Sequence, residues 1–304
     1  MKIQRATFLG VRGVPDLTLD LADARTGAPR GLVVVTGPSG SGKTRLIEAL
    51  VAAKEAVRPY GPAIVGAPWI TAGNAAKILI AFHLDDGERD FAGTPSQVLE
   101  AEVIFRPDQV TCEVEEGLRA VLGRYTHNPN IGKVEYFPAE RKVPMFPPFP
   151  GLGTGEQRVL RPSKDARKYG FILPFLRTLD HDAVRRERFI EILGGLSATC
   201  RYVPDTSGEA VPRCFSSRSG APVAASELSH GEADAVVFAA TAAAIGLGHS
   251  LVFIDRPDLH ADDLDHLVRG LRALGPENQL IVTGRPELAS ATGGAAHVVA
   301  LRGA

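Results

Sequence analysis

The sequence has few cysteines and no excess of charge of either sign. Three cysteines, Cys112, Cys200 and Cys214, are widely spaced among 304 residues, and no two of them form a CxxC pair. An odd number of separated cysteines provides neither a disulfide framework nor a zinc site, so we expect three reduced thiols. The formal charge of −1 argues against a protein covered with basic residues for nucleic acid, although a local basic patch stays compatible with it.

The sequence also lacks an apolar segment long enough to cross a bilayer. Its longest run of small and apolar residues, 234–248, falls short of the roughly 20 residues that a transmembrane helix needs. The first ten residues, MKIQRATFLG, alternate like a strand and contain no apolar core of a signal peptide. We therefore expect a cytoplasmic protein without a membrane partner.

Two kinds of strand pattern predict an α/β fold. Residues 75–86 and 98–108 alternate apolar and polar side chains, as half-exposed antiparallel strands do, and a hairpin is expected over residues 2–21. Fully apolar strands, typical of a buried parallel sheet, are expected at residues 31–37, 250–255 and 279–284. Helical patterns are found at residues 43–54, 165–193, from 231 onwards, and 261–274. Alternation of strands and helices in the C-terminal half indicates a parallel sheet.

A proline-rich segment interrupts these patterns. Residues 144–154, PMFPPFPGLGT, contain four prolines and cannot form a regular element. We therefore divide the chain into an N-terminal lobe (1–140), a part with the proline-rich loop and a helical and β insertion (141–225), and a C-terminal lobe (226–304).

Residues 37–44, GPSGSGKT, form a phosphate-binding pattern, G-x-x-x-x-G-K-S/T. They stand between an apolar strand and a helix, which is the context that this motif requires. Its glycines let backbone N–H groups turn toward phosphates, and the helix N-terminus adds partial positive charge. Lys43 would reach the β- and γ-phosphates, and the Thr44 hydroxyl would bind Mg²⁺. The nucleotide-binding residues predicted from this loop are Gly37, Pro38, Ser39, Gly40, Ser41, Gly42, Lys43 and Thr44.

A second helix start has the sequence LSHGE at residues 228–232. Ser229 and Glu232 have the spacing of a capping box, and taken alone they indicate a well-capped helix. Because a phosphate loop precedes them and a strand ending in Asp255 follows, the segment resembles the ABC-type ATPase signature, L-S-x-G-Q/E. The residues that match the signature are Leu228, Ser229, Gly231 and Glu232.

The resemblance is to the SMC/RecF/OLD-like branch of the ABC-type ATPases, often grouped as AAA family ATPases, and it covers most of the chain. The opening hairpin resembles that branch's first hairpin, with Arg12 and Gly13 at its R-G positions. Residues 134–142, VEYFPAERK, resemble its P-x-x-R loop. The region that holds a long coiled-coil arm in SMC proteins is short here.

The resemblance implies a fold and a mechanism. The fold would be a P-loop NTPase of the ABC-head type, with a parallel core sheet, an N-terminal antiparallel β-subdomain and a helical insertion. Two heads would close on two nucleotides, each ATP with its Mg²⁺ being held by the phosphate loop of one head and the signature helix of the other. Arg12 is included among the expected nucleotide-binding residues.

Two chemical positions of the relatives are changed in this chain. Relatives commonly read D-E-P-E-L-H after the Walker B strand and T-H-S-P-E-L after the last core strand, where this chain reads DRPDLH and TGRPEL. Asp255 then matches a Mg²⁺ ligand, Arg256 replaces the catalytic Glu, and Gly284 replaces a His. An arginine cannot accept a proton from water near neutral pH, and losing a general base costs about 10²–10⁴ in rate.

Three interpretations of this change stay open. Arg256, together with Arg285, would attract the terminal phosphate and favour the bound nucleotide. Asp258 would act as a substitute base, or Arg256 would form a surface salt bridge without any role toward the nucleotide. The candidate catalytic residues are Lys43, Asp255, Arg256 and Asp258, and the candidate metal ligands are Thr44 and Asp255.

Basic residues are concentrated between residues 141 and 168. They are Arg141, Lys142, Arg158, Arg161, Lys164, Arg167 and Lys168, against Glu156 and Asp165. Such a run is more typical of a solvated or partner-facing surface than of a nucleic-acid groove. DNA contact is the alternative, and it would show as binding that weakens steeply with salt.

Two functions are compatible with these features. In the first, the chain is an ATP-binding module that closes as a homodimer or heterodimer and recruits or restrains an effector such as a nuclease, with slow or partner-dependent hydrolysis. In the second, it is an active ATPase whose hydrolysis drives DNA repair or anti-phage defence. The change at Arg256 favours the first.

Overall fold

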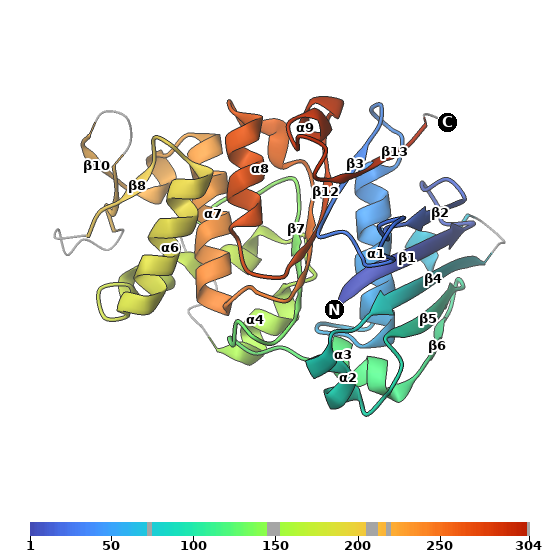
Figure 1. The fold of residues 1–304 in the computed structure, drawn as a ribbon. Coiled ribbons are helices and arrows are strands. Elements are labelled where there is room, and N and C mark those ends of the chain that lie inside the picture. Colours follow the sequence, from blue (N-terminus) through green and yellow to red (C-terminus); the bar gives the residue numbers. More distant parts are fainter. Residues whose placement is uncertain (72–74, 145–152, 205–211, 217–219, 303–304) are drawn as a thin grey trace.

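The computed structural model describes residues 1–71, 75–144, 153–204, 212–216 and 220–302. Figure 1 shows two larger sheets, with helix α1 (Lys43–Val57) between them and most of the remaining long helices on the far side of the parallel sheet. Residues 145–152, which carry most of the predicted proline-rich loop, lie outside the described part of the chain.

The N-terminal sheet is antiparallel and has the strand order β2-β1-β4-β5-β6. Its strands are β1 (Lys2–Leu9), β2 (Leu17–Asp20), β4 (Ala76–His83), β5 (Val98–Phe105) and β6 (Val110–Val114). Buried residues alternate with more exposed ones along β5, as the sequence predicts for a sheet with one solvated face. The predicted hairpin and the predicted antiparallel pair are both confirmed.

The second large sheet is parallel and has the strand order β13-β3-β12-β11-β7. Its strands are β3 (Leu32–Thr36), β7 (Val134–Phe137), β11 (Leu251–Ile254), β12 (Gln279–Thr283) and β13 (His297–Ala300). Every residue of β3, β7, β11 and β12 is buried, which explains why most of their residues are apolar. Because these strands run in one direction, the loops that follow β3, β11 and β12 meet at one edge of the sheet.

Helices cover both faces of the parallel sheet. The longer ones after α1 are α6 (Ala183–Leu196), α7 (His230–Ile245) and α8 (Leu264–Arg272). Shorter helices are α2 (Asp86–Ala92), α3 (Glu116–Leu122), α4 (Thr154–Leu160), α5 (Ile172–Thr178) and α9 (Pro286–Ser290). Single turns of 3₁₀ helix are η1 (Ala67–Trp69), η2 (Ala166–Tyr169), η3 (Ala225–Glu227) and η4 (Pro257–Leu259). A small sheet is formed by β8 (Arg201–Tyr202), β9 (Phe215–Ser216) and β10 (Pro222–Val223).

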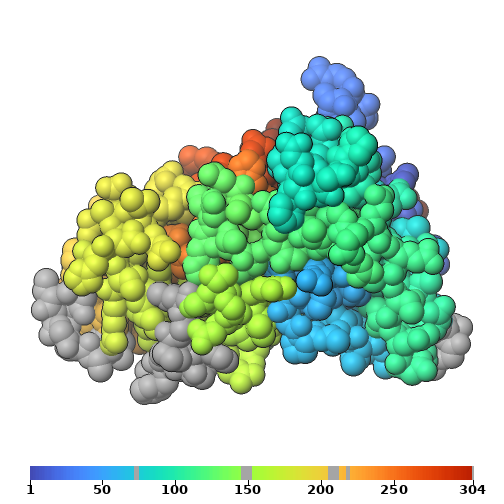
Figure 2. Space-filling view, turned by 90° about the horizontal axis from the view of Figure 1, so that it is seen from below, coloured from blue at the N-terminus to red at the C-terminus, as the bar shows by residue number. Residues whose placement is uncertain are grey.

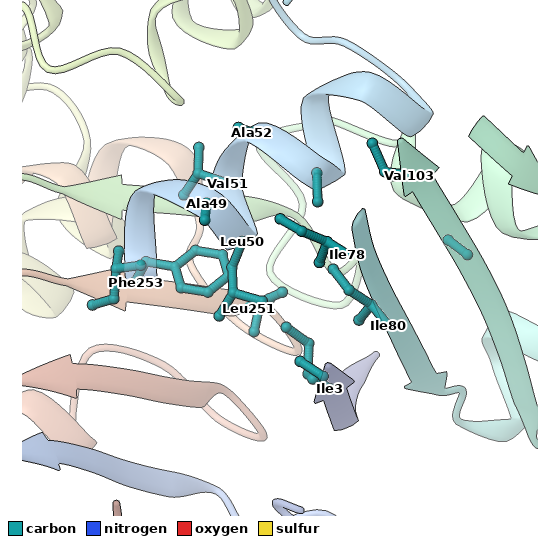
Figure 3. Packing of buried hydrophobic residues seen from close by; sticks show 14 of the residues in the cluster. Ile3, Ala49, Leu50, Val51, Ala52, Ile78, Ile80, Val103, Leu251 and Phe253 are labelled. Carbon is teal, nitrogen blue, oxygen red and sulfur yellow. The ribbon is translucent and has the colours of Figure 1, made fainter. Parts of the chain in front are cut away.

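Helix α1 packs between the two large sheets. Figure 3 shows Leu50 of α1 near Leu251 and Phe253 of β11, with Ile78 of β4 approaching from the antiparallel sheet. Leu50 is 1% exposed, and truncating such a side chain to alanine typically costs about 2–5 kcal/mol. This packing fixes the helix that begins at the phosphate loop against β11, the strand that Asp255 follows.

The helical region predicted over residues 165–193 is broken into three pieces. Gly170 ends η2, and α6 begins only after Asp182, whose side chain accepts a hydrogen bond from the backbone of Arg185. Capping by Asp182 satisfies the free N–H groups of a new helix start, so one continuous helix does not form. Helix α4 was not predicted, and α8 begins at Leu264 instead of residue 261.

Candidate nucleotide-binding site

The phosphate loop connects β3 to α1 and needs its glycines. Gly37, Gly40 and Gly42 have φ angles of 147°, 79° and 90°, which favour glycine. At Gly42 a Cβ would also lie 2.4 Å from the carbonyl oxygen of Gly13. At Gly37 a Cβ would lie 2.6 Å from the carbonyl oxygen of Leu301. Two neighbouring segments therefore hold the loop in its curved form.

The N-terminus of α1 is open to an anion. Gly42 occupies the N-cap position, and no side chain caps the first turn of this helix. Lys43 lies beside it and donates from Nζ to the carbonyl oxygens of Gly37 and Pro38, each at 2.8 Å. Burial, followed by repulsion from Arg256, lowers the pKa of Lys43. Uncapped N–H groups and an adjacent cation form an arrangement suited to a phosphate.

The two predicted metal ligands are in contact. Thr44 donates from its hydroxyl to Oδ1 of Asp255 at 3.0 Å, and Thr283 donates to the same oxygen. Asp255 is 2% exposed, so its carboxylate is held in a fixed position. A hydroxyl and a carboxylate are the oxygen ligands that Mg²⁺ prefers, so these residues fit the metal. The sequence alone assigned no role to Thr283. Its position at the end of one core strand, like that of Asp255 directly after another, is the signal that could have indicated one.

Arg256 stands beside this pair in an unusual backbone conformation. Its φ of 50° is left-handed, and its backbone N–H donates to the hydroxyl of Thr283 at 3.0 Å. Its side chain is 30% exposed and donates from Nε to Oδ1 of Asp258 at 3.1 Å. A non-glycine residue in this region costs about 1–3 kcal/mol and persists only where its surroundings fix it.

Asp258, the residue predicted as a possible substitute base, is engaged by two arginines. Arg285 donates from its backbone N–H and its Nε to Oδ2 of Asp258, at 2.9 and 3.0 Å, while Arg256 occupies the other oxygen. Burial alone would raise the pKa of Asp258, but the hydrogen bonds from Arg285 and Arg256 outweigh it and lower the pKa. A fully buried carboxylate with both oxygens occupied is a poor acceptor for a proton from water.

The first hairpin turn packs against the phosphate loop through its backbone. The carbonyl oxygen of Arg12 accepts from Nε of Arg45 at 3.1 Å, and the next residue, Gly13, touches Gly42. The Arg12 side chain itself is exposed, so its predicted contact with a nucleotide stays a prediction.

The predicted capping box of the signature segment is present at the start of α7. The Ser229 hydroxyl accepts from the backbone N–H of Glu232, and the Glu232 carboxylate accepts from the backbone N–H of Ser229. Glu232 also accepts from the hydroxyl of Thr199 at 3.0 Å. A Cβ at Gly231 would lie 2.7 Å from the carbonyl oxygen of His260, so this turn is packed closely against the loop that follows β11.

The phosphate loop and the signature segment border different hollows. A hollow of about 710 Å³ reaches Gly40 and Ser41, whereas one of about 480 Å³ is lined by Ser229, Gly231 and Glu232. The two hollows share no lining residue. Within one chain the signature helix therefore does not close over its own phosphate loop.

Much of the basic run is internal, which corrects the expectation of a basic surface over residues 141–168. The side chains of Arg141, Arg161 and Lys168 are 0% exposed. Glu135 pairs with Arg161 and Lys168, and burial lowers the pKa of Lys168 to about 8. These cations balance buried carboxylates, because a buried charge needs a partner.

Three other basic residues of the run have partners within the chain. Arg158 of α4 donates to the carbonyl oxygen of Pro59, and in Figure 2 this segment lies against the end of α1. Lys164 pairs with Glu48, and Arg167 pairs with Asp165. The DNA prediction therefore rests on fewer free cations than the sequence indicates.

The comparisons with known proteins identify the fold. No protein-family model and no curated protein matches the sequence. A structure of an SMC head bound to the C-terminal winged-helix domain of ScpA matches with a TM-score of 0.58 and 15% identity, over 96% of this chain and 92% of that one. This chain has the fold of an SMC head domain.

Two further SMC heads agree with this assignment. The SMC head from Thermotoga maritima has a TM-score of 0.52 and 16% identity, over 96% of this chain and 92% of its own. An SMC head with an extended coiled coil, bound to the C-terminal domain of ScpA and derived from Pyrococcus furiosus, has a TM-score of 0.57 and 14% identity, over 95% and 91%. The predicted α/β fold, with its parallel sheet and its antiparallel N-terminal sheet, is confirmed.

In the described part of the chain, no helix is long and apolar enough to cross a membrane.

Proposed function

We propose that the chain binds ATP with Mg²⁺ and closes as a dimer of heads, holding its nucleotide and hydrolysing it slowly. The observation that carries this proposal is the contact between Thr44 and Asp255, directly beside the uncapped start of α1 and the Lys43 ammonium. A phosphate, a divalent cation and a fixed carboxylate would meet at this one edge of the parallel sheet.

Dimer closure is supported by the position of the signature helix. Ser229 caps α7 away from the phosphate loop of its own chain, so the positive end of this helix would serve the nucleotide of a second head. The second head would be another copy of this chain or a related ATPase subunit.

Slow hydrolysis is supported by the groups around Asp255. Arg256 cannot take a proton from water, and Asp258 is already held by Arg256 and Arg285. Gly284 offers no side chain to the terminal phosphate. Under this proposal, bound ATP would be a lasting signal, read by a partner protein such as a nuclease.

A partner on the head surface is supported by two of the matched structures. In both, an SMC head is bound to a C-terminal domain of ScpA. We propose that this chain likewise presents a protein-binding surface whose availability depends on closure.

Sizing chromatography with and without Mg-ATP, followed by a phosphate-release assay, tests the proposal. We expect Mg-ATP to cause dimerisation with little release of phosphate. Lys43→Ala should abolish the dimerisation. Release at several molecules per second by the wild-type chain would instead favour an active ATPase that drives DNA repair or anti-phage defence. No nucleotide-dependent change in size would contradict closure.

A further inference from the structure

Arg141, in the loop after β7, uses all five of its N–H groups within the protein. Its Nε and Nη2 donate to the two carboxylate oxygens of Asp234 at 3.1 and 2.8 Å. Its Nη1 donates to the carbonyl oxygens of Pro138 and Asp255, at 2.6 and 2.8 Å. The second Nη2 hydrogen goes to the carbonyl oxygen of Arg256, at 3.2 Å.

These partners belong to two functional segments that are far apart in the sequence. Asp255 and Arg256 form the loop beside the candidate metal site, where Thr44 contacts the Asp255 carboxylate. Asp234 lies in α7, little more than one turn after Ser229, the residue that caps the signature helix. One guanidinium therefore joins the nucleotide-site loop to the helix that would face a neighbouring head.

The surrounding contacts leave little freedom between the two segments. Gly231 lies against the carbonyl oxygen of His260, and the rings of His230 and His260 stack with centroids 5.0 Å apart. Nδ1 of His260 is also 3.6 Å from Oδ2 of Asp234. A shift of the loop after β11 would therefore be passed to the first turns of α7, because close-packed segments move together.

We propose that Arg141 is a positioning residue that couples a head's own nucleotide site to the signature helix it presents to its partner. The inference rests on the proposed function, because it requires a nucleotide beside Asp255. Phosphate would attract the Arg256 side chain and Mg²⁺ would draw on the Asp255 carboxylate, and Arg141 holds the backbone carbonyls of both residues. Occupancy of one site would thus set the position of Ser229 for the other site.

The planar fork of arginine is what this role requires. A lysine has the same charge, but its three donors from one atom cannot reach two carboxylate oxygens and three carbonyl oxygens together. Arg141→Lys should therefore preserve the buried charge and lose the coupling. Arg161→Lys is the matched control, since Arg161 is equally buried and pairs with Glu135, and among the described residues its hydrogen bonds go to Gln157 and Lys168, outside both segments.

Hydrogen–deuterium exchange of residues 230–236 provides the test. The full chain is studied at a concentration where light scattering shows a monomer, with and without Mg²⁺ and a non-hydrolysable ATP analogue. Nucleotide should change exchange in this segment by about fivefold in the wild type and in Arg161→Lys, since allosteric couplings are commonly of this size. In Arg141→Lys the change should fall below about twofold, while calorimetry shows nucleotide affinity within about threefold of the wild type.

The outcomes separate the inference from the proposed function. An Arg141→Lys chain that keeps the wild-type exchange response would overturn the inference, as would a wild type that binds nucleotide without any response in α7. A wild type that binds no nucleotide would overturn the proposed function, and the inference with it. If Arg141→Lys does not fold, Asp234→Asn replaces it, because it keeps the side-chain shape and removes the charge that Arg141 binds.

Discussion

Under the proposed function, replacing Arg256 with glutamate should speed ATP hydrolysis at the nucleotide site. Arg256 follows Asp255 directly, and its backbone N–H donates to the Thr283 hydroxyl, which itself donates to the Asp255 carboxylate. A carboxylate at the same backbone position would be able to accept a proton from water. General-base catalysis typically contributes about 10²–10⁴ in rate, or about 3–5 kcal/mol of the barrier.

The structural cost of this substitution is limited by Arg285. Asp258 is buried, so the loss of its pair with Arg256, whose side chain is 30% exposed, costs more than the roughly 1 kcal/mol of a surface pair. Arg285 still donates twice to Asp258, which leaves the buried carboxylate with a cationic partner. The chain should therefore remain folded and able to bind nucleotide.

Single-turnover hydrolysis of Mg-ATP is the assay, with Arg256→Gln as the matched control. Glutamine has the size of glutamate but cannot act as a base, so only Arg256→Glu should be faster than the wild type, by about 10²-fold or more. Equal rates for the two variants would refute the reasoning. So would a wild-type rate of several per second that Arg256→Ala leaves unchanged.

Three further predictions concern the loop, the signature helix and the buried acid. Gly42→Ala should weaken Mg-ATP binding by more than about tenfold in calorimetry, because the left-handed backbone costs about 1–2 kcal/mol and the new Cβ meets a carbonyl oxygen. Gly93→Ala is the control: its φ is 67°, and an added Cβ would meet no atom within 4 Å. This variant should lower the free energy of unfolding and leave Mg-ATP binding unchanged. Ser229→Ala should reduce the free energy of unfolding by about 1 kcal/mol through the lost cap, and should weaken ATP-dependent dimerisation while monomeric binding persists. The lowered pKa of Asp258 means that the folded state favours its carboxylate, so this contribution to stability is present above the unfolded pKa of 3.8 and is lost as the pH falls through the lower folded pKa. In urea unfolding, the free energy of unfolding should therefore fall less in Asp258→Asn than in the wild type when the pH is lowered below about 4. Equal decreases in the two chains would contradict the assignment.

Local requirements made the phosphate loop predictable from sequence. The conformations of Gly40 and Gly42 are imposed within a few residues of the motif, and the Lys43 and Thr44 positions follow from where the helix begins. The capping box at Ser229 is equally local, because it joins residues three apart. The sequence of each strand likewise distinguishes the two sheets, because half-exposed strands alternate apolar and polar residues and buried strands are mostly apolar.

Contacts between distant segments account for what sequence missed. Arg141 appears in the sequence as one of a run of cations, but its partner Asp234 is 93 residues away and lies on another helix. Arg161 and Lys168 similarly owe their burial to Glu135 on the edge strand β7. Charge spacing along the chain cannot reveal such pairs, so the run was interpreted as surface. Thr283 was overlooked for the same reason, since its contact with Asp255 depends on the parallel pairing of β11 and β12.

The proposed coupling through Arg141 and the arginine at position 256 are both consistent with the proposal of a head that reports nucleotide occupancy more than it consumes nucleotide. Hydrogen bonds with Thr283, Arg141 and Asp258 hold the loop that contains Asp255 and Arg256. A site held in this way could keep its ligand and signal through α7 for as long as the ligand stays.

Isothermal titration calorimetry of Mg-ATP into the wild-type chain and into Lys43→Ala tests the central claim most directly. One nucleotide should bind per chain, and the alanine variant should bind at least about tenfold more weakly, because a charge-assisted contact to phosphate is worth about 1.5–3 kcal/mol. Absence of binding heat at several temperatures, or equal affinities for the two chains, would contradict the account.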